Sequence, residues 1–216
     1  MRSPKEHLAY LLELAAQPGA RQELVRELAD LLTAWPANYP AEVRASFAAL
    51  LARAEHDIDP EARRELALRL VDCADAPLGL LNEFFFEIPL ASRGKVLQRD
   101  ALIETPVIVD VDEAALVETV RNKRAADLAD ALARAFKIDT LTASEILQDG
   151  SGAGVAIACR GAGLSRAAYS ALTVLAARSN TGARLRAFDA VPERGAATML
   201  TFWRRQATLH AHPQAA

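Results

Sequence analysis

Cysteine and aromatic residues are scarce in this chain of 216 residues, which has 2 Cys, 2 Trp, 3 Tyr and 7 Phe. A disulfide framework usually needs more cysteines, and Cys73 and Cys159 form no Cys-x-x-Cys motif. Each of the two lies in a largely apolar run. We therefore expect two reduced thiols that pack as small hydrophobic side chains.

Long uncharged apolar runs and long basic runs are also missing. A membrane-spanning helix needs about 20 predominantly apolar residues, and the chain contains no such stretch. Its first residues, Met1 to Glu6, lead directly into an amphipathic segment and do not form a signal peptide. These absences predict a cytoplasmic protein without a membrane anchor. The net charge of −3 argues against nucleic acid as a partner.

Alanine and leucine, both strong helix formers, are the residues that dominate instead. Apolar residues recur at helical spacing throughout the chain, which predicts an all-α fold. The expected helices are 5–17, 20–34, 41–55, 59–73, 78–86, 91–97, 112–121, 124–136, 141–149, 152–160, 165–178 and 193–209. Residues 101–111 are expected to form a loop, because Pro106 interrupts a β-branched run.

Helix starts carry the clearest local signals. Asp59, followed by Pro60 and Glu61, is a strong N-terminal pattern, since Asp caps free N–H groups and Pro fits the first turn. Thr142 and Glu145 have the spacing of a capping box, and Ser165 is a further expected N-cap. Asn180-Thr181-Gly182 is expected to form a turn.

Short helix pairs recur at roughly 30–40 residues per unit, which is typical of HEAT-like repeats. This rhythm predicts a HEAT-like α-solenoid of stacked helical hairpins with a C-terminal capping helix. The expected organisation is an N-terminal helical region over residues 1–56, repeats over 57–180, and the last helix with a frayed tail over 181–216. A helical bundle without repeats is the alternative.

The segment from Asp59 to Ala177, about half the chain, also resembles a known family. The residues that carry the resemblance are Asp59-Pro60-Glu61-Ala62-Arg63-Arg64-Glu65-Leu66-Ala67, Ala76-Pro77 with Leu80 and Leu81, Ile88-Pro89-Leu90-Ala91 with Val96-Leu97, and Ala158 and Arg160 ahead of Leu164-Ser165. They resemble a family of uncharacterised, mostly alphaproteobacterial proteins known as domain of unknown function 2336. The resemblance implies HEAT-like repeats in a bacterial protein and supplies no catalytic residue.

Motifs that carry chemistry are weak or missing, so we predict no catalytic residue, cofactor or metal. The four histidines, His7, His56, His210 and His212, have no metal-binding spacing. The run Asp149-Gly150-Ser151-Gly152-Ala153-Gly154 looks like a phosphate loop, but a helix precedes it and the lysine is missing. Free N–H groups of the following helix could still hold an anion there. Asp110, Asp112 and Glu113 have the pattern of an acidic helix start.

Two apolar clusters are the candidates for partner binding. Phe84, Phe85 and Phe86 are consecutive, and adjacent helical positions point about 100° apart, so we expect Phe85 or Phe86 to lie partly on the surface. In the last helix, Trp203, Arg204 and Arg205 could contact a partner or a second copy of the chain. The resulting hypothesis is a non-enzymatic protein-interaction module in bacterial regulation, whose partner is another protein or a second copy of the chain. The alternatives are a nucleic-acid-binding repeat protein and an enzyme of unrecognised class.

Overall fold

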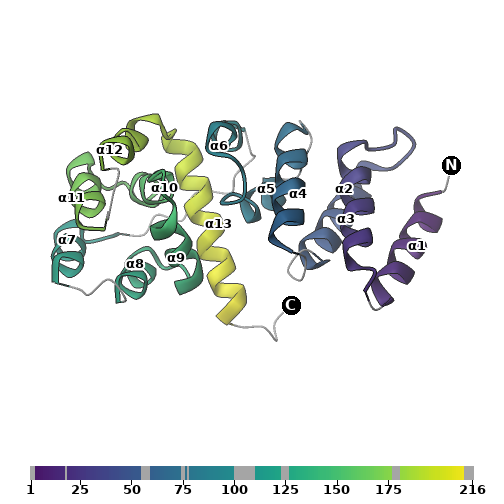
Figure 1. Ribbon diagram of the computed structural model, residues 1–216, viewed down its shortest axis with the longest axis horizontal. Helices are drawn as coiled ribbons and strands as arrows, with labels where there is room; N and C mark the ends of the chain where they lie inside the picture. The colour runs from purple at the N-terminus through teal and green to yellow at the C-terminus, as the bar shows by residue number, and fades with distance from the viewer. Residues whose placement is uncertain are drawn as a thin grey trace. The chain divides into compact units, whose positions relative to one another are not determined.

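A computed structural model describes residues 3–17, 19–54, 59–73, 76, 78–99, 110–122, 127–176 and 181–211. Over these ranges helices are connected by turns and loops and no strand is present, which confirms the predicted all-α class. The helices, labelled in Figure 1, are α1 (Pro4–Ala16), α2 (Arg21–Thr33), α3 (Ala41–Ala54), α4 (Pro60–Asp72), α5 (Leu78–Glu83), α6 (Leu90–Leu97), α7 (Glu113–Asn122), α8 (Leu128–Phe136), α9 (Thr140–Gln148), α10 (Ala153–Gly161), α11 (Arg166–Ala176), α12 (Thr181–Ala190) and α13 (Glu193–Ala211).

Internal contacts divide the chain into two compact units, residues 1–96 and 97–216. The sequence pattern predicts region boundaries after residues 56 and 180. Helices α2 and α4 pack together across the first of these positions, and α10 and α13 pack together across the second. No helix in the described part of the chain is long and apolar enough to cross a membrane.

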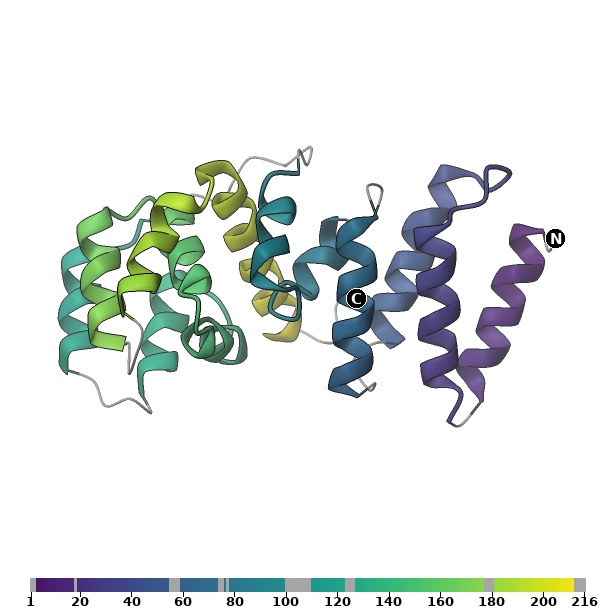
Figure 2. The ribbon, with the colours of Figure 1, turned by 45° about the horizontal axis from the view of Figure 1, so that its top comes forward.

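The N-terminal unit consists of helices that follow one another in space as they do in sequence. Helix α2 packs on α1, α3 and α4, and α5 packs on α3 and α4 (Figure 2). Its core is made of leucine and phenylalanine side chains with no exposed surface: Leu11, Leu28, Leu32, Phe47, Leu51, Leu70, Leu81, Phe84 and Phe85. Each amphipathic helix therefore buries its apolar stripe against its neighbours.

The start of α4 follows the sequence pattern closely. The Asp59 carboxylate accepts hydrogen bonds from the backbone N–H groups of Glu61 at 3.0 Å and Ala62 at 2.9 Å, which confirms Asp59 as the N-cap. These bonds lower the pKa of the exposed Asp59 carboxyl, the one from Ala62 most of all. One turn into the helix, Arg63 forms an ion pair of 2.8 Å with Glu87. Arg63 thus connects α4 to the segment that follows α5.

The helix predicted over 78–86 is too long, because α5 ends at Glu83 and residues 84–87 form a turn. Phe84 and Phe85, the first two residues of this turn, are both completely buried in the core. Arg93 stabilises this turn by donating hydrogen bonds to the carbonyl oxygens of Ile88 and Phe86, each at 2.9 Å. Its guanidinium also lies 5.2 Å from the centre of the Phe85 ring.

Helix α10 is the centre of the C-terminal unit. Every residue from Ala153 to Cys159 is buried, and α9, α11, α12 and α13 all pack against the helix. Helices α7, α8, α9, α10 and α11 form a closed ring of neighbours, since α11 packs on both α10 and α7. A linear stack would leave the first and last of these five helices apart, so α7 to α11 do not form a simple linear stack.

Close approach between α10 and α13 depends on one glycine. A Cβ atom added to Gly161 would lie 2.6 Å from the backbone carbonyl oxygen of Ala196. Four α13 side chains are almost completely buried: Ala196, Met199, Leu200 and Trp203. The last helix is thus a main part of the core of its unit.

Most predicted helices agree with the structure to within a few residues, with three differences besides α5. Helix α12 stands partly where a turn was predicted, at Thr181 and Gly182. The N-cap of α9 is Asp139, which accepts from the Thr142 N–H at 2.8 Å, so the predicted capping box at Thr142 and Glu145 is wrong. Helix α8 begins at Leu128. The loop predicted at 101–111 lies almost wholly outside the described residues.

Candidate functional site

An open groove of about 490 Å³ runs between α7 and α11 in the C-terminal unit. The α7 residues that line the groove include four at the spacing i, i+3, i+4 and i+7, which places them on one face of the helix. Three alanines of α11 form the opposite wall. The lining residues are Glu113, Ala114, Val117, Glu118, Arg121, Ala167, Ala168 and Ala171. The α11 wall consists only of short alanine side chains, which leaves space between the two helices.

A polar link joins the first turns of the two helices. The Glu113 carboxylate accepts from the Ser165 backbone N–H at 2.8 Å and from the Ser165 hydroxyl at 2.6 Å. Ser165 Oγ accepts in turn from the Ala168 N–H at 3.1 Å, which confirms Ser165 as the predicted N-cap of α11. Glu113 is the first residue of α7, so the two helices start side by side and run in the same direction. The hydrogen bonds from Ser165 lower the pKa of the Glu113 carboxyl, which is therefore ionised at neutral pH.

The other end of the groove carries a paired charge and an apolar extension. Arg121 forms an ion pair of 2.9 Å with Glu118, which also accepts from the Asn122 side chain at 2.7 Å. On α11 the stripe of Ala167 and Ala171 continues to Val174, whose side chain is 57% exposed. Leu175, 43% exposed, is next to it. The apolar surface of α11 therefore extends beyond the groove itself.

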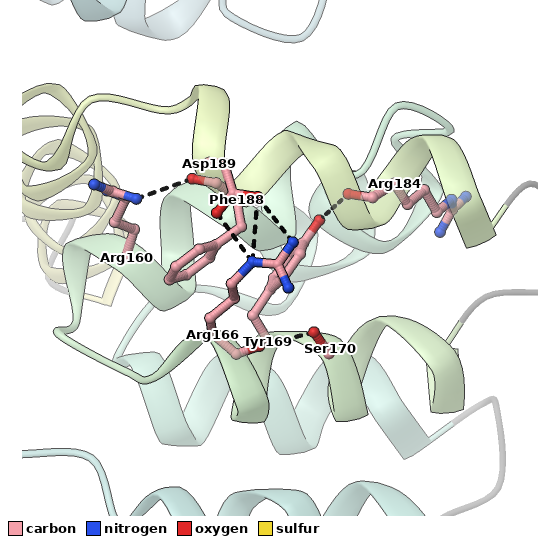
Figure 3. Close-up of polar contacts among 7 residues, drawn as sticks. All are labelled: Arg160, Arg166, Tyr169, Ser170, Arg184, Phe188 and Asp189. Atoms are coloured by element: carbon pink, nitrogen blue, oxygen red, sulfur yellow. Dashed lines mark hydrogen bonds and ion pairs between the residues drawn. The ribbon is translucent and has the colours of Figure 1, made fainter.

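Behind the groove, polar and aromatic contacts fix α11 against α10 and α12 (Figure 3). Arg166 binds both carboxylate oxygens of Asp189, and this ion pair lowers the pKa of the Asp189 carboxyl. The buried Tyr169 ring stacks on Phe188 at 5.0 Å, and its hydroxyl donates to the Arg184 carbonyl oxygen. Burial raises the pKa of this phenol. Arg160 donates to the Phe188 carbonyl oxygen at 3.1 Å. The groove wall is thus a rigid surface.

The glycine-rich run that looks like a phosphate loop already holds an anion of its own. The Asp149 carboxylate accepts from the Gly154 N–H at 2.9 Å and from the Ser151 hydroxyl at 2.8 Å. The Ala153 N–H donates to Ser151 Oγ at 3.1 Å. Gly152, with φ of +77°, allows the turn. The expectation that free N–H groups could bind an anion here is wrong, because a carboxylate occupies that position.

The predicted partner-binding residues are spread over both units, and only some reach the surface. Phe84 and Phe85 are completely buried, so they belong to the core. Phe86 is partly exposed, as expected for one of the last two phenylalanines. In α13, Trp203 and Arg204 are buried and Arg205 is exposed.

The burial of Arg204 has a structural role. Its Nε donates to the Phe136 carbonyl oxygen, at the C-terminus of α8, at 2.8 Å. A cation at this position satisfies an otherwise unpaired helix carbonyl group. Only Phe86 and Arg205 of the six predicted residues are therefore placed to contact a partner.

The metal-ligating residue types and the two cysteines form no candidate metal site or disulfide in the described ranges. Over these residues no group of three or more His, Cys, Asp or Glu could hold a metal ion. Neither cysteine forms a disulfide in the described ranges. Burial strongly raises the pKa of Cys159, which keeps it as the thiol, the unreactive form of the side chain. Cys73 lies next to backbone carbonyl oxygens of Leu32 and Thr33.

The sequence reasoning missed the groove. Its two faces are visible in the sequence as alanine and valine at helical spacing, but nothing local shows that α7 and α11 are neighbours. They are separated by three helices along the chain. Comparison of the chain with protein-family models, curated proteins and solved structures finds no match.

Proposed function

We propose that the chain is a non-enzymatic helical module that binds a protein partner in the groove between α7 and α11. The observation that carries the proposal is the groove itself. Alanines of α11 form one wall, charged side chains lie at both ends, and the apolar surface of α11 continues to the exposed Val174. A groove of this kind suits the helix-in-groove mode of recognition, in which an amphipathic helix inserts its apolar side chains.

The size of the groove is adequate for such an interaction. Two or three inserted apolar side chains would each contribute roughly 1.5–3 kcal/mol, from which the cost of association is subtracted. Together they would contribute roughly 3–9 kcal/mol, which is of the same order as the cost of association, so the contact is expected to be weak. Such a role fits the bacterial, cytoplasmic regulatory protein that the sequence predicts.

The finer fold class belongs to the same proposal. We propose HEAT-like repeats for the segment 57–180, as the resemblance to domain of unknown function 2336 implies. Consecutive packing of α4 with α5, α7 with α8, and α8 with α9 supports it. The wrapped position of α10 and the placement of α13 against it are departures from a simple stack with a terminal cap.

The alternative of nucleic-acid binding has less support. Arg160 and Arg204 donate to backbone carbonyl oxygens, and Arg166 pairs with Asp189. A duplex-binding surface needs several cations that face the phosphates. These three are already committed to the fold of the C-terminal unit.

The test compares two exposed alanines of the same unit. Ala167 lines the groove, whereas Ala115 lies on α7 outside the lining. Ala167→Arg would fill the groove with a long charged side chain, and Ala115→Arg is the matched control. Both variants are expected to keep the helical content and melting temperature of the wild type, because both positions are exposed.

The tagged full-length variants are expressed in the native cell, and co-purifying proteins are quantified by mass spectrometry. We expect a protein that co-purifies equally with wild type and Ala115→Arg but is depleted at least about tenfold with Ala167→Arg, a change of about 1.4 kcal/mol. Identical interaction profiles for the two variants would show that the groove is not a binding site. Light scattering on the purified chain detects a second copy as the partner.

A further inference from the structure

The charge distribution of the groove indicates what occupies it. Building on the proposed function, we infer that the occupant is an amphipathic helix of another protein, antiparallel to α7 and α11, with basic residues in its last turn beside Asp112 and Glu113. The apolar face of this helix would contact the alanines of α11 that line the groove. The partner's chemistry and its orientation are thereby both specified.

The end of the groove where α7 and α11 begin is acidic. Asp112 and Glu113 are both ordered there, Asp112 by accepting from the Ala115 N–H at 2.9 Å and Glu113 by its bonds to Ser165. Neither carboxylate has an ion-pair partner among the described residues. Asp110, also exposed, adds a third negative charge just before α7.

Helix dipoles reduce this charge without removing it. The N-terminus of each helix is equivalent to roughly half a positive charge, so α7 and α11 together offset about one of the carboxylates. Arg166 is close in sequence to Ser165, but its guanidinium is paired with Asp189. A net negative charge therefore remains at this end, and it favours a cationic group on the occupant.

The opposite end has no comparable net charge. Glu118 and Arg121 neutralise each other in their ion pair, and α11 presents Val174 and Leu175 to solvent. The groove is thus polar and acidic at one end and apolar at the other. An occupant with uniformly distributed charge would match only one of the two ends.

The same asymmetry sets the direction of the occupant. Lysine and arginine are most favourable in the last turn of a helix, where they interact with its own dipole. An antiparallel helix places its C-terminus, with these side chains, at the acidic end. A parallel helix would place there its N-terminus, which favours acidic residues and would face the carboxylates of α7.

The experiment uses a phage-displayed library of helix-forming peptides of about 18 residues, which is longer than the roughly 12–15 residues below which isolated helices are marginal. Apolar residues vary at positions i, i+3, i+4 and i+7, and Lys, Glu and Ser vary in the first and last turns. The library is selected on the full chain, and binders that also bind Ala167→Arg are removed. We expect the remaining peptides to carry Lys in the last turn and not in the first.

Two isosteric variants test the acidic end directly. Asp112→Asn keeps an acceptor for the Ala115 N–H, and Glu113→Gln keeps an acceptor for Ser165, so each removes charge with little change in shape. The double variant is expected to bind the selected peptide about five-fold more weakly, and the difference should shrink at high salt. Asp127→Asn, an exposed carboxylate elsewhere in the unit, is the control.

The outcomes separate the inference from the proposed function. Peptides with Lys in the first turn, or affinity that is unchanged in the double variant, would overturn the inferred charge and direction while groove binding stands. Absence of any peptide that distinguishes wild type from Ala167→Arg would overturn the helical occupant. The proposed function itself depends on the separate co-purification experiment with Ala167→Arg and Ala115→Arg.

Discussion

Phe85 and Phe86 offer a sharp test of the turn that follows α5. Phe85 has no exposed surface, and its ring contacts Phe86 edge to face at 5.6 Å and the Arg93 guanidinium at 5.2 Å. Phe86 is partly exposed. If the turn orients them in this way, truncation of the two side chains should have very different effects on the N-terminal unit.

The expected magnitudes follow from burial. Phe85→Ala should lower the free energy of unfolding by roughly 3–5 kcal/mol, because a fully buried ring is removed and a cavity remains. Phe86→Ala should cost at most about 1.5 kcal/mol, since part of its ring already contacts water. With a urea m-value of about 2 kcal/mol/M, Phe85→Ala should lower the unfolding midpoint by about 2 M.

Urea unfolding with fluorescence detection is the assay, and the chain provides a reporter in each unit. Trp35 lies in the N-terminal unit beside Tyr39 and Phe47, and Trp203 lies in the C-terminal unit. A Trp203→Phe background leaves Trp35 to report the N-terminal unit alone. Phe85→Leu, expected to cost roughly 1–2 kcal/mol, serves if Phe85→Ala does not fold. Equal midpoints for Phe85→Ala and Phe86→Ala would refute the orientation described here.

Three further changes probe the C-terminal unit. Gly161→Ala should destabilise this unit by roughly 1–3 kcal/mol, because the added Cβ clashes with the Ala196 carbonyl oxygen. Gly150→Ala is the control, since a Cβ at Gly150 meets open space. Equal melting temperatures for the two variants would contradict the close contact between α10 and α13. Arg204→Met should destabilise by about 2 kcal/mol and Arg205→Met by much less in urea unfolding, because only Arg204 is buried against the end of α8. Tyr169→Phe should cost about 1 kcal/mol near neutral pH through loss of the bond to the Arg184 carbonyl oxygen. Because the folded-state pKa of Tyr169 lies above the ordinary 10.0, its stabilisation is complete below pH 10 and is lost as pH rises through the folded value. The stability difference between wild type and Tyr169→Phe should therefore narrow at high pH, and a constant difference would show that the phenol does not titrate with unfolding.

The candidate site shows where sequence reasoning was sufficient and where it was not. Ser165 and the acidic pattern at Asp112 and Glu113 were recognised as helix starts, and both are. That the two starts are linked to each other could not be inferred, because 52 positions separate Glu113 from Ser165. The groove lies between two helices that this long-range pairing connects. The phenylalanine run predicts that Phe85 or Phe86 is partly exposed, and only the packing of the N-terminal unit decided that it is Phe86.

By itself, the sequence determined that this chain is helical and where most of its helices begin and end. Those features depend on residues a few positions apart, such as the Asp59 cap and the Ala and Leu stripes, so local propensity and periodicity are sufficient to predict them. Only the tertiary structure decided which helix is central, which arginines are buried, and that α7 and α11 enclose a groove. These depend on contacts between distant segments, where Ala, Leu and Arg each suit either core or surface according to what packs against them.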